Sequence, residues 1–280
     1  MPRECYAIIG LAKTGTTAVA MTLANTLQIQ RFCMEPMDLA AIEAEQHDRL
    51  VTKMLFDHWS SRVDQLKGFL CDTTKGGAPI TIAIVRDPRD EAISRLHYLA
   101  YNYFSKHPTT DDDCAAWLDI FYRKEAAPDS IGLVEMENQL KERFGVGFLA
   151  GRQLYDVYRQ FIDEMLERSA APVYLLRYED FVDNSIPDGR LRTLLSGSRN
   201  VGPWLKRVHR SGSSGDWQRF LTDGDLVVLN HLCEPLLRRF DYPLERRAAG
   251  NEPSRKTGSD YVAGLISEAR QLYQQRPRGA

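Results

Sequence analysis

Hydrophobic and polar residues at the start of the chain follow first a strand pattern and then a helix pattern. Residues 6–9 are apolar, include two β-branched isoleucines and end at Gly10, which predicts a short buried strand. Between residues 18 and 27, apolar side chains recur at helical spacing and no proline interrupts them. Together they predict a strand–loop–helix unit whose loop carries glycines, a lysine and hydroxyl side chains.

Further strands are predicted along the chain. The run from Ile80 to Val85 is the clearest, because its residues are almost all apolar or β-branched. Such a run is typical of the centre of a parallel sheet that is covered on both faces. The pattern also predicts strands at residues 28–34 and 172–178, and a strand edge at residues 69–71.

Helices are predicted between these strands. One begins at Pro88, since proline is favoured at the first helical position, and runs toward Phe104. The others cover residues 39–59, two or three segments up to residue 170, residues 223–240 and residues 260–275. This alternation predicts an α/β fold with a doubly wound, mainly parallel sheet flanked by helices. We expect residues 1–245 to form one domain, and residues 246–280 to form a linker and a C-terminal helix packed on or extending from it.

Composition and charge narrow the class of protein. The 280 residues carry a formal net charge of −2, so no global field attracts nucleic acid or an anionic membrane. The five cysteines are scattered without a C-x-x-C pair, which argues against a disulfide framework or a zinc site and for a reducing compartment. No apolar run approaches the roughly 18 residues that a membrane span needs. Since Met1 lies so close to the first strand, we expect no signal peptide and a cytoplasmic location.

The first loop has the features of a phosphate site. Amide groups at the positive end of a helix bind anions. Gly10 and Gly15 have the spacing of a Walker A motif, and Thr17 occupies its hydroxyl position. However, Thr16 replaces the motif's lysine, and the lysine has moved back to Lys13. Lys13 would reach a group leaving the end of a 5′-phosphate, unless the segment is an ordinary glycine-rich turn.

A second motif, R-D-P-R-D, follows the predicted central strand. Arg86 would lie at the carboxyl edge of the sheet, where open α/β folds bind ligands. Ser94 lies one to two turns into the next helix, so the two side chains could hold one phosphate. The alternative is a surface cluster of ion pairs at the start of that helix.

A third motif, R-S-G-S-S-G-D-W, begins at Arg210. Its glycines and small hydroxyl residues, including Ser211 and Gly212, form a loop whose amides can approach an anion closely. Trp217 and Phe220 would anchor this loop to the core. The alternative is a flexible surface loop.

In this order the three motifs resemble those of sulfotransferases, which use 3′-phosphoadenosine 5′-phosphosulfate (PAPS), and the resemblance spans residues 8–242. It implies a P-loop-like fold in which Lys13, Thr14, Gly15, Thr16 and Thr17 bind the 5′-phosphosulfate, while Arg86, Ser94, Arg210, Ser211 and Gly212 bind the 3′-phosphate. Tyr178, in a family-like Y-E-D segment, would lie near the adenine or simply fill the core. The chain departs from the family pattern at Ser211, which replaces a lysine, at Leu221, which separates the F-T pair, and at Ala18, where many cytosolic members have tryptophan.

Sulfuryl transfer also needs a general base, because the acceptor hydroxyl must lose a proton. Small-molecule sulfotransferases often use a histidine in a K-T-H segment, and residues 70–74 contain none. The chain more closely resembles bacterial and carbohydrate-type members with a glutamate after the second strand, which implies Glu35. The alternative is that Glu35 pairs with an arginine such as Arg31. His58 and Asp72 are the reserve candidates for the base.

The resulting hypothesis is an enzyme that moves a sulfuryl group from PAPS to a hydroxyl. Lys13 and Glu35 would be catalytic, and no metal would be required, since lysine and helix amides supply the positive charge. The expected acceptor is a small molecule, a carbohydrate or a lipid, with neither nucleic acid nor a membrane span involved. The alternatives are a P-loop kinase and a non-catalytic nucleotide-binding module.

Overall fold

The structure, a computed structural model, describes residues 4–30, 32–45, 48–74, 77–147, 153–200, 214–245 and 253–276. The chain forms two compact units. Residues 1–86 and 155–209 make up the first unit, and residues 87–154 and 210–280 make up the second.

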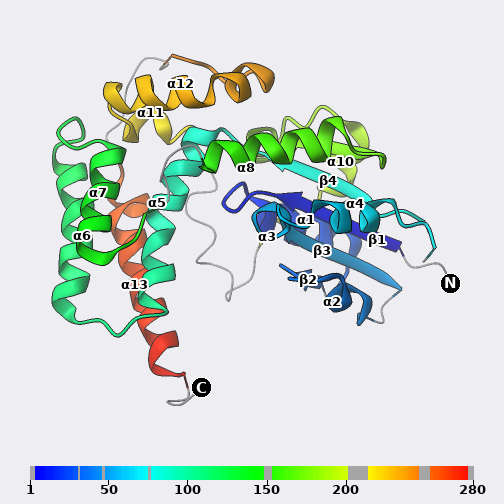
Figure 1. The fold of residues 1–280 in the computed structure, drawn as a ribbon, viewed down its shortest axis with the longest axis horizontal. Helices are drawn as coiled ribbons and strands as arrows, with labels where there is room; N and C mark the ends of the chain where they lie inside the picture. The colour runs from blue at the N-terminus through cyan, green and yellow to red at the C-terminus, as the bar shows by residue number, and fades with distance from the viewer. Residues whose placement is uncertain are drawn as a thin grey trace. The chain divides into compact units, whose positions relative to one another are not determined.

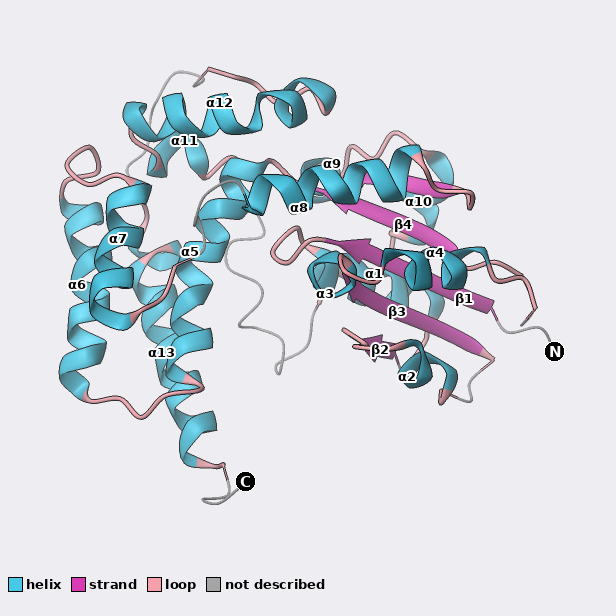
Figure 2. Ribbon diagram, viewed as in Figure 1, coloured by secondary structure: helices cyan, strands magenta, loops and turns pink. Residues whose placement is uncertain are grey.

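The first unit contains a five-stranded sheet whose neighbouring strands are all parallel (Figure 2). Its strand order is β2-β3-β1-β4-β5, so the first strand lies at the centre. Ile8 and Ile9 are consecutive residues of β1, so their side chains point to opposite faces of the sheet. Both are fully buried, which means that both faces are covered. The strands are β1 (Glu4–Gly10), β2 (Phe32–Met34), β3 (Arg49–Leu55), β4 (Ile80–Val85) and β5 (Val173–Arg177).

Helices cover this sheet. Val19 and Leu23 of α1 pack against Ile8 and Ile82 on one face. Figure 1 draws α4 and α8 in front of the strands, and Lys67 of α4 forms an ion pair with Glu164 directly after α8. The helices are α1 (Thr16–Leu27), α2 (Leu39–Glu43), α3 (Phe56–Trp59), α4 (Val63–Cys71), α8 (Gln153–Ile162, with a π-helical turn at Asp163–Glu167), α9 (Tyr178–Val182) and α10 (Gly189–Leu194).

Two predicted elements were wrong. Residues 39–59 do not form one helix, because the chain makes the short α2, then strand β3, then α3. Leu50 and Met54, which lie within the predicted helix, are buried residues of β3. Residues 69–71 are the end of α4 rather than a strand edge. The α/β class with a parallel sheet flanked by helices is confirmed.

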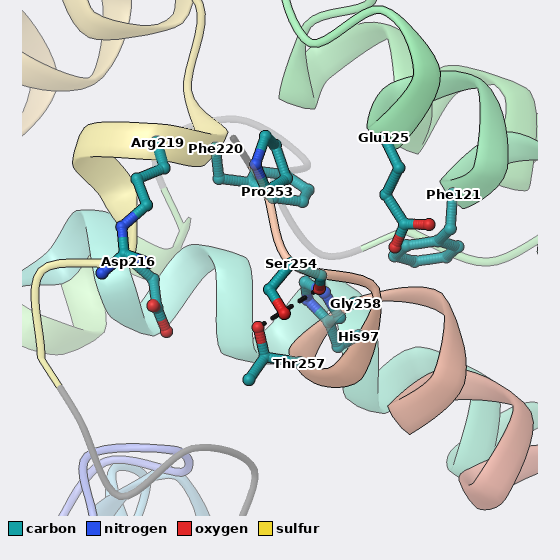
Figure 3. Close-up of a pocket in the computed structure, with 10 residues that line it drawn as sticks. All are labelled: His97, Phe121, Glu125, Asp216, Arg219, Phe220, Pro253, Ser254, Thr257 and Gly258. Carbon is teal, nitrogen blue, oxygen red and sulfur yellow. Dashed lines mark hydrogen bonds between the residues drawn. The ribbon is translucent and has the colours of Figure 1, made fainter. Parts of the chain in front are cut away.

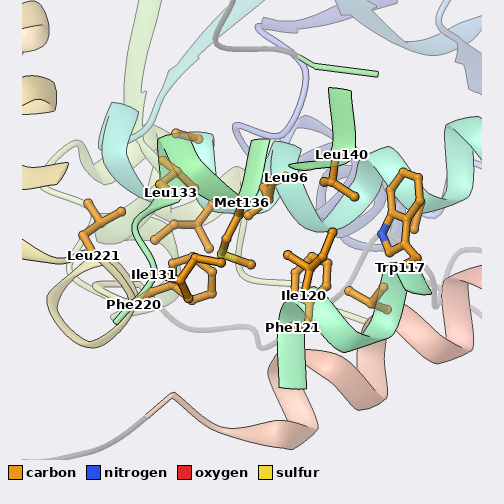
Figure 4. Packing of buried hydrophobic residues seen from close by; sticks show 14 of the residues in the cluster. Leu96, Trp117, Ile120, Phe121, Ile131, Leu133, Met136, Leu140, Phe220 and Leu221 are labelled. Carbon is orange, nitrogen blue, oxygen red and sulfur yellow. The ribbon is translucent and has the colours of Figure 1, made fainter. Parts of the chain in front are cut away.

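The second unit is helical in its described part. Its core surrounds Trp117, and Figure 4 shows side chains from α5, α6 and α7 meeting those of Phe220 and Leu221. Val262 and Ile266 of α13 are buried in the same core. The elements are α5 (Pro88–Phe104), α6 (Asp111–Ala126), α7 (Leu133–Phe144), α11 (Trp217–Phe220), α12 (Asp223–Arg239), a 3-10 turn (Arg255–Thr257) and α13 (Ser259–Gln274).

Among the helices that the structure describes, none combines the length and the apolar character needed to cross a bilayer.

Candidate functional site

The loop between β1 and α1 is tightly folded. Lys13 and Gly15 both have positive φ angles, 70° and 93°. The Thr14 hydroxyl donates a hydrogen bond to the carbonyl oxygen of Leu11 at 2.8 Å. Gly15 is the N-cap of α1 and provides no side-chain cap, and the first turn of α1 has no acidic residue. The first amides of this helix are therefore not offset by a carboxylate of the helix itself, which suits an anion.

Two glycines of the loop are required by close contacts. A Cβ atom at Gly10 would lie 2.7 Å from Oγ1 of Thr14. A Cβ atom at Gly15 would lie only 2.1 Å from Cδ2 of Tyr178. The ring of Tyr178 thus packs directly against the loop, while 8% of the residue remains exposed.

Arg86 connects the end of β4 to the same loop. Its Nη1 donates a hydrogen bond to the carbonyl oxygen of Lys13 at 3.0 Å, and its guanidinium carbon lies 4.8 Å from the centre of the Tyr178 ring. Arg86 is 6% exposed. Within the first unit, the structure therefore brings together Lys13, Gly15, Arg86 and Tyr178, which the sequence motifs had placed far apart in the chain.

Two residues of this site were missed by the sequence reasoning. The hydroxyl of Tyr158 in α8 accepts a hydrogen bond from the Arg86 amide at 2.9 Å and donates one to the Arg86 carbonyl at 2.6 Å. Oδ2 of Asp57, two residues after β3, accepts a hydrogen bond from the Ala12 amide at 2.7 Å. Both side chains bind backbone atoms, and residue-type motifs carry no signal for such contacts. The prediction of one helix over residues 39–59 further concealed that Asp57 follows a strand.

Glu35 lies directly after β2, in a left-handed conformation with φ 51°. Its amide donates a hydrogen bond to the Lys53 carbonyl at 2.8 Å, and its carboxylate forms an ion pair with the Lys53 ammonium. The Lys53 side chain is 4% exposed and the Glu35 side chain is 40% exposed. The sequence left open an ion pair between Glu35 and an arginine such as Arg31. The described partner is Lys53, and Arg31 lies outside the described residues.

The two reserve base candidates lie at opposite ends of the sheet. His58 is in α3, just after the carboxyl end of β3, and its Nδ1 is buried without a hydrogen-bond partner in the described part of the chain. Asp72 caps the turn after α4, where it accepts hydrogen bonds from the amide and hydroxyl of Thr74. That turn leads into the amino end of β4, whereas Lys13 follows the carboxyl end of β1. Asp72 therefore lies at the opposite edge of the sheet from the loop that carries Lys13.

In the second unit, residues of the second and third motifs are joined. The buried carboxylate of Asp90 accepts hydrogen bonds from the amides of Gly215 and Trp217 at 2.6 and 2.9 Å. Buried Arg89 pairs with Asp87 at 2.6 Å, and its guanidinium carbon lies 3.7 Å from the centre of the Trp217 ring. The R-D-P-R-D segment is therefore not a surface cluster of ion pairs.

Of the remaining predicted ligands of the 3′-phosphate, the structure describes only Ser94. Ser94 lies in α5 and is 8% exposed. Arg210, Ser211 and Gly212 lie outside the described residues.

A small pocket in the second unit arises from packing and helix capping (Figure 3). The carboxylate of Glu125 accepts hydrogen bonds from the amide and hydroxyl of Ser259 at 2.6 and 2.7 Å, where α13 begins. The Nδ1 atom of His97 lies 2.7 Å from the Ile93 carbonyl oxygen, and its ring packs 5.4 Å from the ring of Phe220. Of the predicted phosphate ligands that the structure describes, none lines this pocket.

A larger cavity, of about 260 Å³, lies in the first unit beside α2 and α4. It is lined by Cys5 and Pro79, which lie at the amino ends of β1 and β4, so it opens at the edge of the sheet away from Lys13. Within the described ranges, no group of three or more His, Cys, Asp or Glu side chains is placed to hold a metal ion.

Comparison with known proteins gives one family. The sulfotransferase domain family matches residues 6–188 of the chain. A search of curated protein sequences finds no significant match. Among solved structures, the chain is similar to the crystal structure of a mouse sulfotransferase complexed with PAP, at 13% sequence identity and a TM-score of 0.43, over 95% of this chain and 89% of that chain.

Proposed function

The chain belongs to the sulfotransferase domain family, and we propose that it transfers a sulfuryl group from PAPS to a hydroxyl of a small-molecule, carbohydrate or lipid acceptor. The observation that carries the proposal is the hydrogen bond that joins Arg86, directly after β4, to Lys13 in the loop between β1 and α1. A lysine inside the loop, an α1 N-terminus without an acidic first turn and an arginine bonded to the Lys13 carbonyl gather positive charge around one point. This arrangement suits the 5′-phosphosulfate end of a nucleotide, whose negative charge would lie at the N-terminus of α1.

The residue roles follow from position. The amides and hydroxyls of residues 14–17 would hold the 5′-phosphate at the positive end of α1. Arg86, with Ser94, Arg210, Ser211 and Gly212, would hold the 3′-phosphate, and Tyr178 would lie near the adenine. In the reaction, the acceptor oxygen forms a bond to sulfur, and the bond from sulfur to the bridging oxygen of the phosphosulfate breaks. Lys13 would neutralise the charge that grows on this leaving oxygen.

Glu35 is the proposed general base. It follows the carboxyl end of β2, at the same edge of the parallel sheet as the loop after β1. Because its side chain is 40% exposed, an acceptor can approach it, while the ion pair with Lys53 fixes its position. A carboxylate held in this way can take the proton of the acceptor hydroxyl.

Nucleotide binding tests the proposal. 3′-Phosphoadenosine 5′-phosphate (PAP) should bind far more tightly than AMP, and calorimetry would measure both affinities. Since a hydrogen bond to a charged group is worth about 1.5–3 kcal/mol, Arg86→Ala should weaken PAP binding by about tenfold or more and remove most of the difference. Equal affinity of the wild-type protein for PAP and AMP would contradict the proposal.

Turnover separates the enzyme from the alternatives. Formation of PAP from PAPS should require an acceptor and continue in excess EDTA, because Lys13 supplies the cation. Strict dependence on magnesium with turnover of ATP would favour a kinase instead. Binding of PAP without turnover on any of a set of phenols, sugars and lipid alcohols would favour a non-catalytic nucleotide-binding module.

A further inference from the structure

We propose that Asp57 is a positioning residue for Lys13, and that it acts through the backbone amide of Ala12, the residue before this lysine. The inference rests on the proposed sulfuryl transfer, since it concerns the residue assigned to the leaving oxygen. It goes beyond that assignment because no sequence motif included Asp57.

The geometry is a clamp on both sides of Lys13. On the amino-terminal side, the Ala12 amide donates to Oδ2 of Asp57 at 2.7 Å. On the carboxyl-terminal side, the Lys13 carbonyl accepts from Arg86 at 3.0 Å. Between these two contacts, Lys13 has a φ angle of 70°.

That backbone conformation needs support from outside the loop. Left-handed φ angles cost residues other than glycine free energy and persist where surrounding contacts enforce them. The side-chain oxygen of Asp57, which accepts the Ala12 amide at 2.7 Å from outside the loop, supplies such a contact. The orientation of the Lys13 peptide sets the direction in which its side chain leaves the loop, and therefore where its ammonium lies.

The sequence around Asp57 explains why a carboxylate reaches this point. Strand β3 pairs with β1 in parallel, with Leu55 opposite Gly10, so the residues after both strands emerge at the same edge. The short helix α3 then begins at Phe56, whose side chain is fully buried and packs against Phe161 at 5.3 Å. This anchor places the next residue, Asp57, beside the loop.

Two substitutions separate positioning from charge. Asp57→Asn keeps an oxygen that can accept the Ala12 amide, whereas Asp57→Ala does not. Because a misplacement of about 1 Å can cost on the order of 10²-fold in rate, Asp57→Ala should lower kcat by about 10- to 100-fold. Asp57→Asn should stay within about threefold of wild type, as expected when the hydrogen bond rather than the charge matters. PAP affinity should change little in either variant, because the amides of residues 14–17 do not involve Ala12.

A double-mutant comparison tests whether Asp57 acts through Lys13. Lys13→Arg keeps a cation on the loop but displaces it. In that background, Asp57→Ala should cost at most about threefold in kcat, because interacting residues are not additive. Asp64→Ala, which removes an exposed carboxylate near the start of α4, is the matched control and should behave as wild type.

The outcomes are distinct. Equal losses of kcat in Asp57→Asn and Asp57→Ala would overturn the inference, since they would assign Asp57 a role that needs its charge or its proton. Wild-type kcat in Asp57→Ala, or an undiminished loss in the Lys13→Arg background, would overturn it too. If Asp57→Ala does not fold, Asp57→Ser, whose hydroxyl is attached one bond closer to the backbone, replaces it. Failure of the wild-type protein to bind PAP or to use PAPS would instead refute the proposed function.

Discussion

Nη1 of Arg86 donates a hydrogen bond to the carbonyl oxygen of Lys13, and the two atoms are 3.0 Å apart. The first residue of the second motif is thus bonded to the loop of the first motif. A guanidinium has five N–H donors, so one side chain can support a loop and also bind a phosphate. In the proposed nucleotide complex, the loop that holds the 5′-phosphate would then be hydrogen-bonded to Arg86, which holds the 3′-phosphate.

Arg86→Lys tests this double role. Lysine keeps the charge but lacks the planar fork, so it cannot bond the Lys13 carbonyl and a phosphate in the same geometry. PAP affinity should fall by about tenfold, the value of one charged hydrogen bond. Calorimetry would measure it, with Arg190→Lys as control, because Arg190 contacts the Tyr174 ring and hydroxyl elsewhere in the first unit. Unchanged PAP affinity in Arg86→Lys would show that the fork is unnecessary.

Tyr158→Phe removes the hydroxyl that holds the backbone of Arg86. Tyr158 is 1% exposed, so the Arg86 amide and carbonyl would lose a partner in a buried place. An unsatisfied buried group costs about 1–3 kcal/mol, and the free energy of unfolding should fall by that order. Urea unfolding would measure the change, with the half-buried Tyr155 of the same helix as the matched control (Tyr155→Phe). A loss no greater than that of Tyr155→Phe would contradict the assigned role.

The strand–loop–helix unit around Gly10 could be predicted because each of its parts has a local signal. The strand is apolar, the loop has glycines at motif spacing, and the helix is periodic. Strand β3 could not be predicted in the same way. Lys53 interrupts its apolar pattern, and only the structure shows that this buried lysine is compensated by an ion pair with Glu35.

The residues of the candidate site likewise fall into those with a local sequence signal and those without one. Lys13, Gly15 and Arg86 belong to motifs and were therefore found from the sequence. Asp57 and Tyr158 bind backbone amides or carbonyls of residues distant in sequence, and the sequence around them carries no motif for such contacts. Their contribution depends on strand register and helix packing, which no local pattern encodes.

Gly15→Ala should disrupt the loop. The new Cβ would lie 2.1 Å from the Tyr178 ring, and the φ angle of 93° is strained for alanine. PAP binding should be lost or weakened by more than about tenfold, as when several charged hydrogen bonds are misplaced. Tyr178→Ala in the same protein should restore part of the binding that Gly15→Ala loses, because the clash is relieved while the backbone strain and the loss of the Tyr178 ring remain. Gly68→Ala in α4 should leave binding unchanged, because in the described part of the chain the new Cβ would meet nothing within 4 Å beyond its chain neighbours and its own helix backbone. Wild-type binding in Gly15→Ala would contradict the observed packing.

Cys233 should resist modification. Burial, reinforced by the negative charges of Glu91 and Asp87, raises the pKa of this thiol to about 12. The reactive thiolate is therefore scarce at pH 8.5, and an alkylating reagent should label exposed Cys71 much faster. Unfolding returns the pKa to its ordinary value, so this group lowers stability as the pH rises above about 9. Mass spectrometry of labelled peptides would measure both rates, and equal labelling of the two cysteines in the native protein would contradict the burial.

The last prediction separates Glu35 from Lys13 by the acidity of the acceptor. General-base catalysis typically contributes about 10²–10⁴-fold, so Glu35→Gln should lower kcat on an aliphatic alcohol by that range. On an acidic phenol the loss should be smaller, because the hydroxyl gives up its proton more readily. Lys13→Ala should lower kcat on both acceptors alike, since the role proposed for Lys13 is at the leaving group. PAP affinity should stay nearly unchanged in Glu35→Gln.

Glu4 offers a matched control for Glu35, because the two glutamates pair with residues at opposite ends of β3. Glu4 pairs with Arg49 at 2.9 Å at the amino end of β3, whereas Glu35 pairs with Lys53 near its carboxyl end. Glu4→Gln removes the same charge from another ion pair of β3, so it should leave kcat unchanged if position at the carboxyl edge is what matters. If Glu35→Gln kept wild-type kcat on the alcohol while His58→Ala abolished it, the base would be His58. The nucleotide site would survive that result, because it depends on the loop after β1 and on Arg86 rather than on either base candidate.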